Sequence, residues 1–94
     1  MAGMDWTGRG EHIDMESSVL LWRQVADDIA AAIGSGELKP GERLPNEFAL
    51  AETYGVARVT IRRAMEDLKA RRLVRVQQGR GTFVTRTAGE PPAE

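Results

Sequence analysis

The sequence predicts a mainly α-helical domain with a small β wing, the winged helix-turn-helix arrangement of three helices and a two- or three-stranded antiparallel hairpin sheet. Apolar residues recur at helical spacing in three separate stretches. A glycine turn separates the second stretch from the third, and two short β-rich runs around a glycine-rich tip end the pattern. We expect this domain to occupy residues 17–86, after a flexible arm at residues 1–16 and before a disordered tail at residues 87–94.

The first helix is expected from a cap at Ser17 or Ser18 to about Ile33, because serine suits the position before a helix. One side of it carries an apolar stripe with spacings of three and four, typical of a helix that packs on a core. The stripe consists of Leu21, Trp22, Val25, Ala26, Ile29, Ala30 and Ile33. The following segment, "GSGELKPGERLP", predicts a structured turn, because two leucines interrupt its glycines and prolines.

The second helix is expected from Glu47 to about Tyr54. Asn46 is a good capping residue, and Glu47 places negative charge where the helix dipole favours it. Gly55 follows, and glycine commonly ends a helix in the left-handed conformation. The third helix is expected over 58–72, with Ile61, Ala64, Met65 and Leu68 facing inward. Two helices joined by a tight glycine turn predict a helix-turn-helix.

The hairpin is expected in the stretch "RLVRVQQGRGTFV". Leu73 to Val76 and Thr82 to Thr85 have strand composition, and the residues between them hold two glycines and an arginine. Its length is typical of the wing that helix-turn-helix proteins carry, and we place that wing at residues 77–82.

Charge is distributed unevenly along the chain. Residues 1–53 hold four basic and ten acidic residues, whereas residues 54–86 hold nine basic and two acidic ones, so their formal charges are −6 and +7. The last eight residues add −2, which leaves −1 for the chain. A separated basic half is the usual footprint of a site for a polyanion, although charge alone equally fits a solvated face.

Several classes of function are unsupported. The 94 residues contain no cysteine, which excludes disulfides and thiol chemistry, and His12 is the only histidine. We therefore expect no enzyme, no metal site and no cofactor. No stretch is apolar for long enough to span a bilayer, and no signal peptide opens the chain, so we expect a cytoplasmic protein with no membrane partner.

The front of the third helix has the side chains that base recognition needs. The second helix of such a pair lies in the major groove of DNA and uses its N-terminal residues there, which indicates Arg58, Thr60 and Arg62. Arginine matches the acceptors of guanine, and threonine suits a phosphate or a thymine methyl. The alternative for the arginines is a solvated helix face or, for Arg62, a pair with Glu66 one turn later. In the wing, Arg80 between two glycines suits a narrow minor groove.

Residues from about Leu21 to Val84 resemble the winged helix-turn-helix domain of the GntR family of bacterial transcription regulators. The matching segments are "WRQVADDIAAAIGSGELKPGERLPNE", "LAETYGVARVTIRRAMEDL" and "LVRVQQGRGTFV", in that order, and "GRGTFV" resembles the branch that holds the histidine-utilisation repressors. The resemblance implies a homodimer that reads a short inverted repeat in double-stranded DNA. Our candidate DNA-contacting residues are Asn46, Arg58, Val59, Thr60, Arg62, Arg63, Gln78, Gly79, Arg80 and Thr82.

Three positions depart from the family pattern. Asn46 stands where serine is common, and it can cap the helix equally well. Phe48 stands where the family commonly has an arginine that touches DNA; it changes the preferred bases, or it packs against the arm or a partner subunit. Ala57 stands where serine or threonine is common, and an alanine cap leaves a backbone donor unsatisfied.

We therefore expect a sequence-specific DNA-binding transcription regulator, acting as a repressor. The alternative is a winged-helix module for protein–protein interaction, with Trp6, Trp22 and Phe48 as anchors. Family members usually carry a second domain that binds a metabolite and holds a dimer together. Both a piece of a longer regulator and a single-domain form fit the chain, and we expect no small-molecule effector on it.

Overall fold

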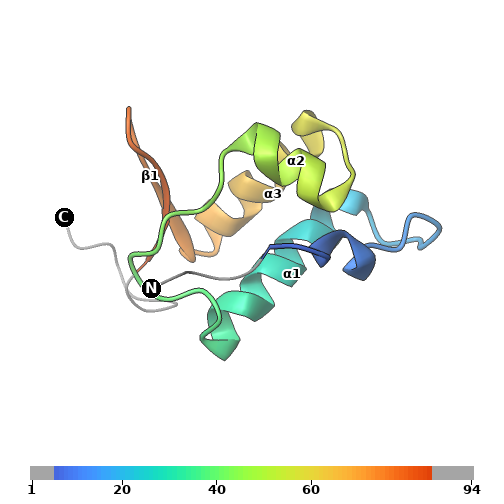
Figure 1. Cartoon of the computed structure of the whole chain (residues 1–94), viewed down its shortest axis with the longest axis horizontal. Coiled ribbons are helices and arrows are strands. Elements are labelled where there is room, and N and C mark those ends of the chain that lie inside the picture. Colours follow the sequence, from blue (N-terminus) through green and yellow to red (C-terminus); the bar gives the residue numbers. More distant parts are fainter. Residues whose placement is uncertain (1–5, 86–94) are drawn as a thin grey trace.

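The computed structural model describes residues 6–85. Figure 1 shows the helices gathered into one body, with the hairpin extending from one side of it. In chain order the elements are the short 3-10 helix η1 (Arg9–His12), the helices α1 (Leu21–Ser35), α2 (Glu47–Tyr54) and α3 (Arg58–Ala70), and the strands β1 (Val74–Gln77) and β2 (Gly81–Val84). The predicted fold class of three helices and an antiparallel hairpin is confirmed.

The start of α1 differs from the prediction. The helix begins at Leu21, and its capping position is Leu20, which makes no side-chain cap bond. Ser17 instead accepts a hydrogen bond from the backbone N–H of Val19, at 3.0 Å. Gln24 folds back and donates to the carbonyl of Val19 at 2.9 Å. The prediction that a serine caps this helix is therefore wrong, because these contacts hold residues 17–19 in a turn before the helix starts.

The second helix has the predicted bounds. The side chain of Asn46 accepts a hydrogen bond from the Ala49 N–H at 2.8 Å, which caps α2. Gly55 ends it with a φ of 69°, the left-handed conformation that favours glycine. The third helix ends at Ala70, two residues before the predicted end, and Arg72 takes a φ of 64°. This left-handed residue turns the chain from α3 into the hairpin.

The hairpin pairs β1 with β2 in register, with Val74 opposite Val84 and Gln77 opposite Gly81. The loop before α2 adds an extended segment to β2, because Arg43 bridges Phe83 and the Leu44 N–H donates to the carbonyl of Thr82 at 2.8 Å. The wing is thus attached to the α1–α2 loop as well as to the end of α3.

The core lies where α1 crosses α3 and where α2 and the hairpin cover them. The predicted inner stripes of α1 and α3 supply its centre, and the two leucines of the α1–α2 loop are buried as their size suggested. The buried apolar residues are Val25, Ala26, Ile29, Ala32, Leu38, Leu44, Leu50, Ala51, Tyr54, Ile61, Ala64, Leu68, Val74 and Val84. This core fixes the angle between α2 and α3, and hence the direction in which the front of α3 faces.

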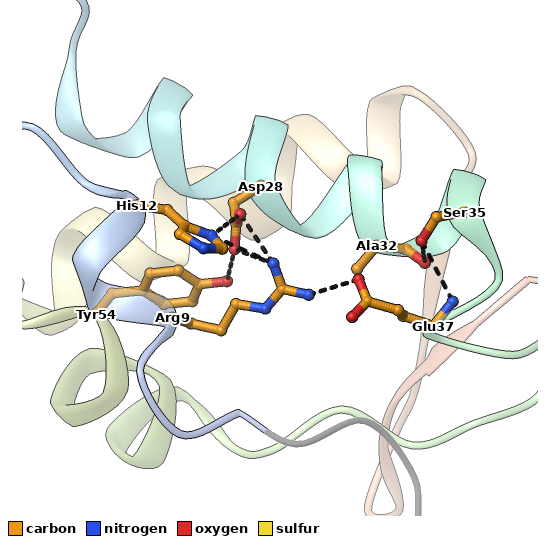
Figure 2. Close-up of polar contacts among 7 residues, drawn as sticks. All are labelled: Arg9, His12, Asp28, Ala32, Ser35, Glu37 and Tyr54. Carbon is orange, nitrogen blue, oxygen red and sulfur yellow. Dashed lines mark hydrogen bonds and ion pairs between the residues drawn. The ribbon is translucent and has the colours of Figure 1, made fainter.

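A polar cluster joins the N-terminal segment to α1 and α2 (Figure 2). Asp28 of α1 accepts a hydrogen bond from the Tyr54 hydroxyl at 2.7 Å and one from Arg9 Nη1 at 3.1 Å. His12 Nδ1 lies 2.7 Å from the same carboxylate, and Arg9 also donates to Glu37 at 2.8 Å. Burial and the bond to Asp28 raise the pKa of Tyr54 above its ordinary value. The cluster ties the end of α2 to α1.

Residues 6–16 therefore have defined contacts, and Trp6 packs edge-on against Tyr54 with ring centroids 6.4 Å apart. Gly10 passes so close to α2 that a Cβ there would lie 2.7 Å from the carbonyl oxygen of Thr53. The predicted division into arm, domain and tail stays a prediction, and the tail at residues 87–94 lies outside the described residues.

Within residues 6–85, no helix combines the length and apolar character required to cross a membrane. The same residues contain no group of three or more histidine or acidic side chains placed to hold a metal ion.

Candidate nucleic-acid interface

The front of α3 follows a tight turn and presents its charged side chains to solvent. Gly55 ends α2, and Ala57 is the capping residue of α3, with no side-chain cap bond. Arg58, Val59 and Arg62 are exposed, whereas Thr60 is partly buried. The side chains of Arg58 and Arg62, two of the candidate DNA-contacting residues, therefore face solvent.

Arg58 and Arg62 both bind the carboxylate of Glu47, the first residue of α2. Arg58 Nε lies 3.1 Å from Oε1, and Arg62 donates from Nε to Oε2 at 2.9 Å and from Nη2 to Oε1 at 3.1 Å. The hydrogen bond from Arg62 lowers the pKa of Glu47, desolvation opposes the shift, and Arg58 adds to it. The same bond raises the pKa of Arg62. Both guanidinium groups therefore meet at the first turn of α2.

This pairing was not among the sequence predictions, which considered Glu66 as the partner of Arg62. Glu66 instead pairs with Lys69 at 3.8 Å. The Glu47 pairs leave the arginine side chains 59% and 60% exposed, so most of each side chain remains open to solvent. One carboxylate shared by two arginines also leaves one positive charge in excess.

The other candidate DNA-contacting residues of the helices lie near Arg58 and Arg62 but make different contacts. Arg63 turns back toward α1, and its guanidinium carbon lies 5.1 Å from the centroid of the Trp22 ring, a cation–π contact. Asn46 uses its side-chain oxygen for the cap of α2. Phe48, next to Glu47, is 57% exposed.

The tip of the hairpin is exposed at Gln78, Gly79 and Arg80. Gly79 has a φ of 76°, and the Arg80 N–H closes the turn on the carbonyl of Gln77 at 2.9 Å. Thr82 is partly buried and lies opposite Val76 in the hairpin. Its backbone carbonyl accepts the hydrogen bond from the Leu44 N–H. The tip thus presents one arginine between two glycines to solvent.

Arg43 is a basic residue near the wing that the sequence predictions did not select. A Cβ on Gly81 would lie 2.8 Å from Arg43 Nε, so this guanidinium crosses the hairpin close to the Gly81 backbone, whose φ of 126° favours glycine. Arg43 could have been identified from the sequence only if the pairing of the α1–α2 loop with β2 had been predicted. No residue pattern near Arg43 indicates that pairing.

A cavity of about 290 Å³ separates the wing from the helices. Its walls combine apolar Leu50, Met65 and Val76 with the cations Arg43, Arg62 and Lys69. Glu47 and Glu66 line the same cavity, so the described surface between the start of α2, α3 and the hairpin is concave and combines three cations with two carboxylates.

Comparison with known proteins identifies relatives of this domain. The family model described as "Bacterial regulatory proteins, gntR family" matches residues 21–84. The mannosyl-D-glycerate transport/metabolism system repressor MngR of Escherichia coli (strain K12) is 48% identical over 64 residues, which cover 68% of this chain and 27% of that protein. The chain spans between 27% and 31% of the length of the first three curated relatives that it matches.

Solved structures show the same fold. YtrA from Sulfolobus acidocaldarius, a GntR-family transcription factor, superposes with a TM-score of 0.76 at 37% identity and covers 81% of this chain and 80% of its own. AraR(DBD) in complex with operator ORR3 has a TM-score of 0.66 at 36% identity, with 77% of this chain and 89% of that chain covered.

Proposed function

The chain belongs to the GntR family of bacterial regulatory proteins, and we propose from this that it binds a specific sequence of double-stranded DNA and regulates transcription. One observation carries the proposal: Arg58 and Arg62 present two exposed guanidinium groups at one place, beside a glycine-tipped hairpin. Guanidinium groups suit both guanine edges and phosphates. The comparisons agree with this reading, since AraR(DBD) is described in complex with operator DNA.

In the proposed complex the front of α3 enters the major groove. Arg58 and Arg62 exchange Glu47 for guanine acceptors, while Thr60 and the capped start of α2 at Asn46 lie against phosphates. Val59 faces the groove, and Arg63 reaches a phosphate from its place over Trp22. In the wing, Gln78, Gly79, Arg80 and Thr82 lie along the minor groove.

Transcriptional repression is the proposed outcome of binding, by analogy with the relative named a repressor. We propose further that two copies bind an inverted repeat, since a twofold-symmetric site matches a symmetric pair of domains. The proposed place of action is the bacterial cytoplasm, where the chromosome is. Nothing in the comparisons favours the alternative of a protein-interaction module.

The test is selection of bound duplexes from a random DNA pool, followed by titration of the selected duplex at several salt concentrations. We expect one enriched inverted repeat, and affinity that falls linearly with salt on logarithmic axes. Arg62→Ala should lower the discrimination against a scrambled duplex by about 1–3 kcal/mol.

Arg23→Ala is the matched control, because Arg23 is an exposed arginine of α1 whose partner is Asp27. It should keep the discrimination of the unchanged chain. The absence of any enriched sequence, or equal discrimination by the Arg62→Ala and Arg23→Ala proteins, would refute the proposal. A half-site that binds as tightly as the whole repeat would refute the two-copy arrangement alone.

A further inference from the structure

Arg63 differs from Arg58 and Arg62 in the group that holds its side chain. The other two arginines bind the carboxylate of Glu47. The guanidinium carbon of Arg63 instead lies 5.1 Å from the centroid of the Trp22 ring, and among residues 6–85 no carboxylate pairs with it. An aromatic ring attracts a cation without cancelling its charge. Arg63, which is exposed, therefore keeps its full positive charge at the surface of α3.

The three arginines leave α3 in two directions. At the helical rotation per residue, Arg58 and Arg62 lie about 40° apart around the helix, and Arg63 lies about 100° beyond Arg62. The first two side chains reach the start of α2. The side chain of Arg63 reaches the first turn of α1, where Trp22 is the second residue. Arg63 thus lies on the flank of α3 that faces α1.

This direction determines what Arg63 meets in the proposed complex. A helix in the major groove directs one face to the base edges, and its flanks lie beside the sugar–phosphate backbones. Since Arg58 and Arg62 point to the bases, Arg63 points to a backbone. An exposed guanidinium with no carboxylate partner suits a phosphate, because it offers several N–H donors together with a full charge.

Trp22 restricts the positions that this guanidinium can take. Its ring is partly buried and packs against the core, so it forms a fixed surface on α1. A freely moving arginine side chain loses rotamer freedom when it binds, and that loss weakens association. A contact with Trp22 that exists before DNA arrives reduces the loss for Arg63.

We propose that Trp22 is a positioning residue, which holds Arg63 on the flank of α3 for a contact with one backbone phosphate. The proposal rests on the proposed function, which it deepens. A phosphate carries no base identity. Loss of Arg63 should therefore weaken binding to the selected duplex and to a scrambled duplex by similar factors, in contrast to loss of Arg62.

The experiment replaces the phosphates of the selected duplex one at a time by uncharged methylphosphonates. In the unchanged chain, replacement of each contacted phosphate should weaken binding. In the Arg63→Ala protein, one of these positions in each half-site should lose its effect, and the salt dependence should fall by about one unit of slope. That position identifies the phosphate that Arg63 contacts.

Variants of Trp22 then test the positioning role. Trp22→Leu should weaken binding about two- to fivefold, the value of one exposed cation–π contact, and should reduce the methylphosphonate effect at the same position. In the Arg63→Ala background, Trp22→Leu should weaken binding no further. Trp22→Phe keeps an aromatic ring and should restore part of the affinity, and it replaces Trp22→Leu in the series if thermal melting shows that the leucine protein does not fold.

Arg23→Ala is the matched control, because Arg23 is the next residue of α1 and its partner is Asp27. This protein should keep the methylphosphonate effect at every position. If it loses the effect at the position assigned to Arg63, the contact does not belong to Arg63 and the proposal is wrong.

The other outcomes separate this proposal from the proposed function. A selective duplex whose methylphosphonate profile is the same for the unchanged and Arg63→Ala proteins overturns the phosphate contact and leaves the function intact. If the Trp22 substitution weakens binding equally with and without Arg63, Trp22 serves the core alone and the positioning role is overturned. If the random pool yields no selective duplex, the proposed function fails and this inference fails with it.

Discussion

Replacement of Asp28 by alanine is the sharpest test of how the helix-turn-helix is held on α1. The Asp28 side chain is 11% exposed and contacts the Tyr54 hydroxyl, Arg9 and His12 at 2.7, 3.1 and 2.7 Å (Figure 2). Asp28→Ala removes the common partner of three groups, two from η1 and one from the end of α2.

The expected cost follows from what the substitution leaves behind. The Tyr54 hydroxyl loses its bond to Asp28 on a residue that is 1% exposed, and Arg9 keeps its bond to Glu37, whose side chain is 58% exposed. Removal of one partner of a buried ion pair costs about 3–5 kcal/mol, and the retained pair with Glu37 favours the lower value. A loss of about 3 kcal/mol corresponds to a fall of roughly 12–24 °C in melting temperature for a domain of this size.

The neighbouring carboxylate provides the control. Asp27 is 52% exposed and pairs with Arg71 at 2.8 Å and with Arg23 at 3.6 Å. Each pair this exposed contributes about 0–1 kcal/mol, so Asp27→Ala, which removes both, should lower the free energy of unfolding by no more than about 2 kcal/mol. Urea denaturation followed by circular dichroism gives both values. If Asp28→Ala costs no more than Asp27→Ala, the cluster does not hold the segments together and the reasoning is wrong.

Three further predictions concern single residues. Glu47→Gln removes the charge shared by the two arginines, so it should strengthen binding to a scrambled duplex and steepen the salt dependence by about one unit of slope; an unchanged slope in a salt titration contradicts this. Ala57→Ser adds a side-chain cap to α3 and should raise the free energy of unfolding by about 0.5–2 kcal/mol, and an equal or lower melting temperature would show that the serine forms no cap. Burial raises the pKa of Tyr54, so its contribution to stability is complete below about pH 10 and is lost as the pH rises through the folded-state value. The difference in urea midpoint between the unchanged chain and Tyr54→Phe should therefore shrink in alkaline buffer, and a constant difference argues against it.

Local signals predicted the elements of this fold well. Asn46 and Gly55 are the capping and terminating residues of α2, and both act within a few residues along the chain. The end of α3 was predicted too late because the residue that turns the chain is Arg72, and arginine rarely takes a positive φ. Ser17 was misplaced as a cap because its hydroxyl also fits a turn, and sequence does not distinguish the two.

Contacts between distant residues were beyond the sequence. The sequence indicated Arg58 and Arg62 as DNA-contacting candidates, but their shared partner Glu47 lies 11 and 15 residues away along the chain. Arg9 lies in the segment predicted to be a flexible arm, although its side chain is 10% exposed. The one local trace of that packing is Gly10, where the close approach to α2 excludes a side chain. Long-range ion pairs have no sequence period, so pattern analysis does not find them.

The Glu47 pairs bear directly on the proposed contact between the arginines and DNA. Free arginine side chains would lose rotamer freedom on binding, and that loss weakens association. A carboxylate that holds both guanidinium groups at the start of α2 reduces this loss, because the two groups are already together before a duplex arrives. Exchange of the carboxylate for guanine acceptors costs little free energy, because the arginines are about 60% exposed and exposed ion pairs contribute little to stability. A scrambled duplex offers phosphates without the matching guanine acceptors. Glu47 therefore competes for the guanidinium groups more effectively against a scrambled duplex than against the specific one. In the proposed complex, the same ion pairs that hold the arginines in the free protein therefore favour the specific duplex over other DNA.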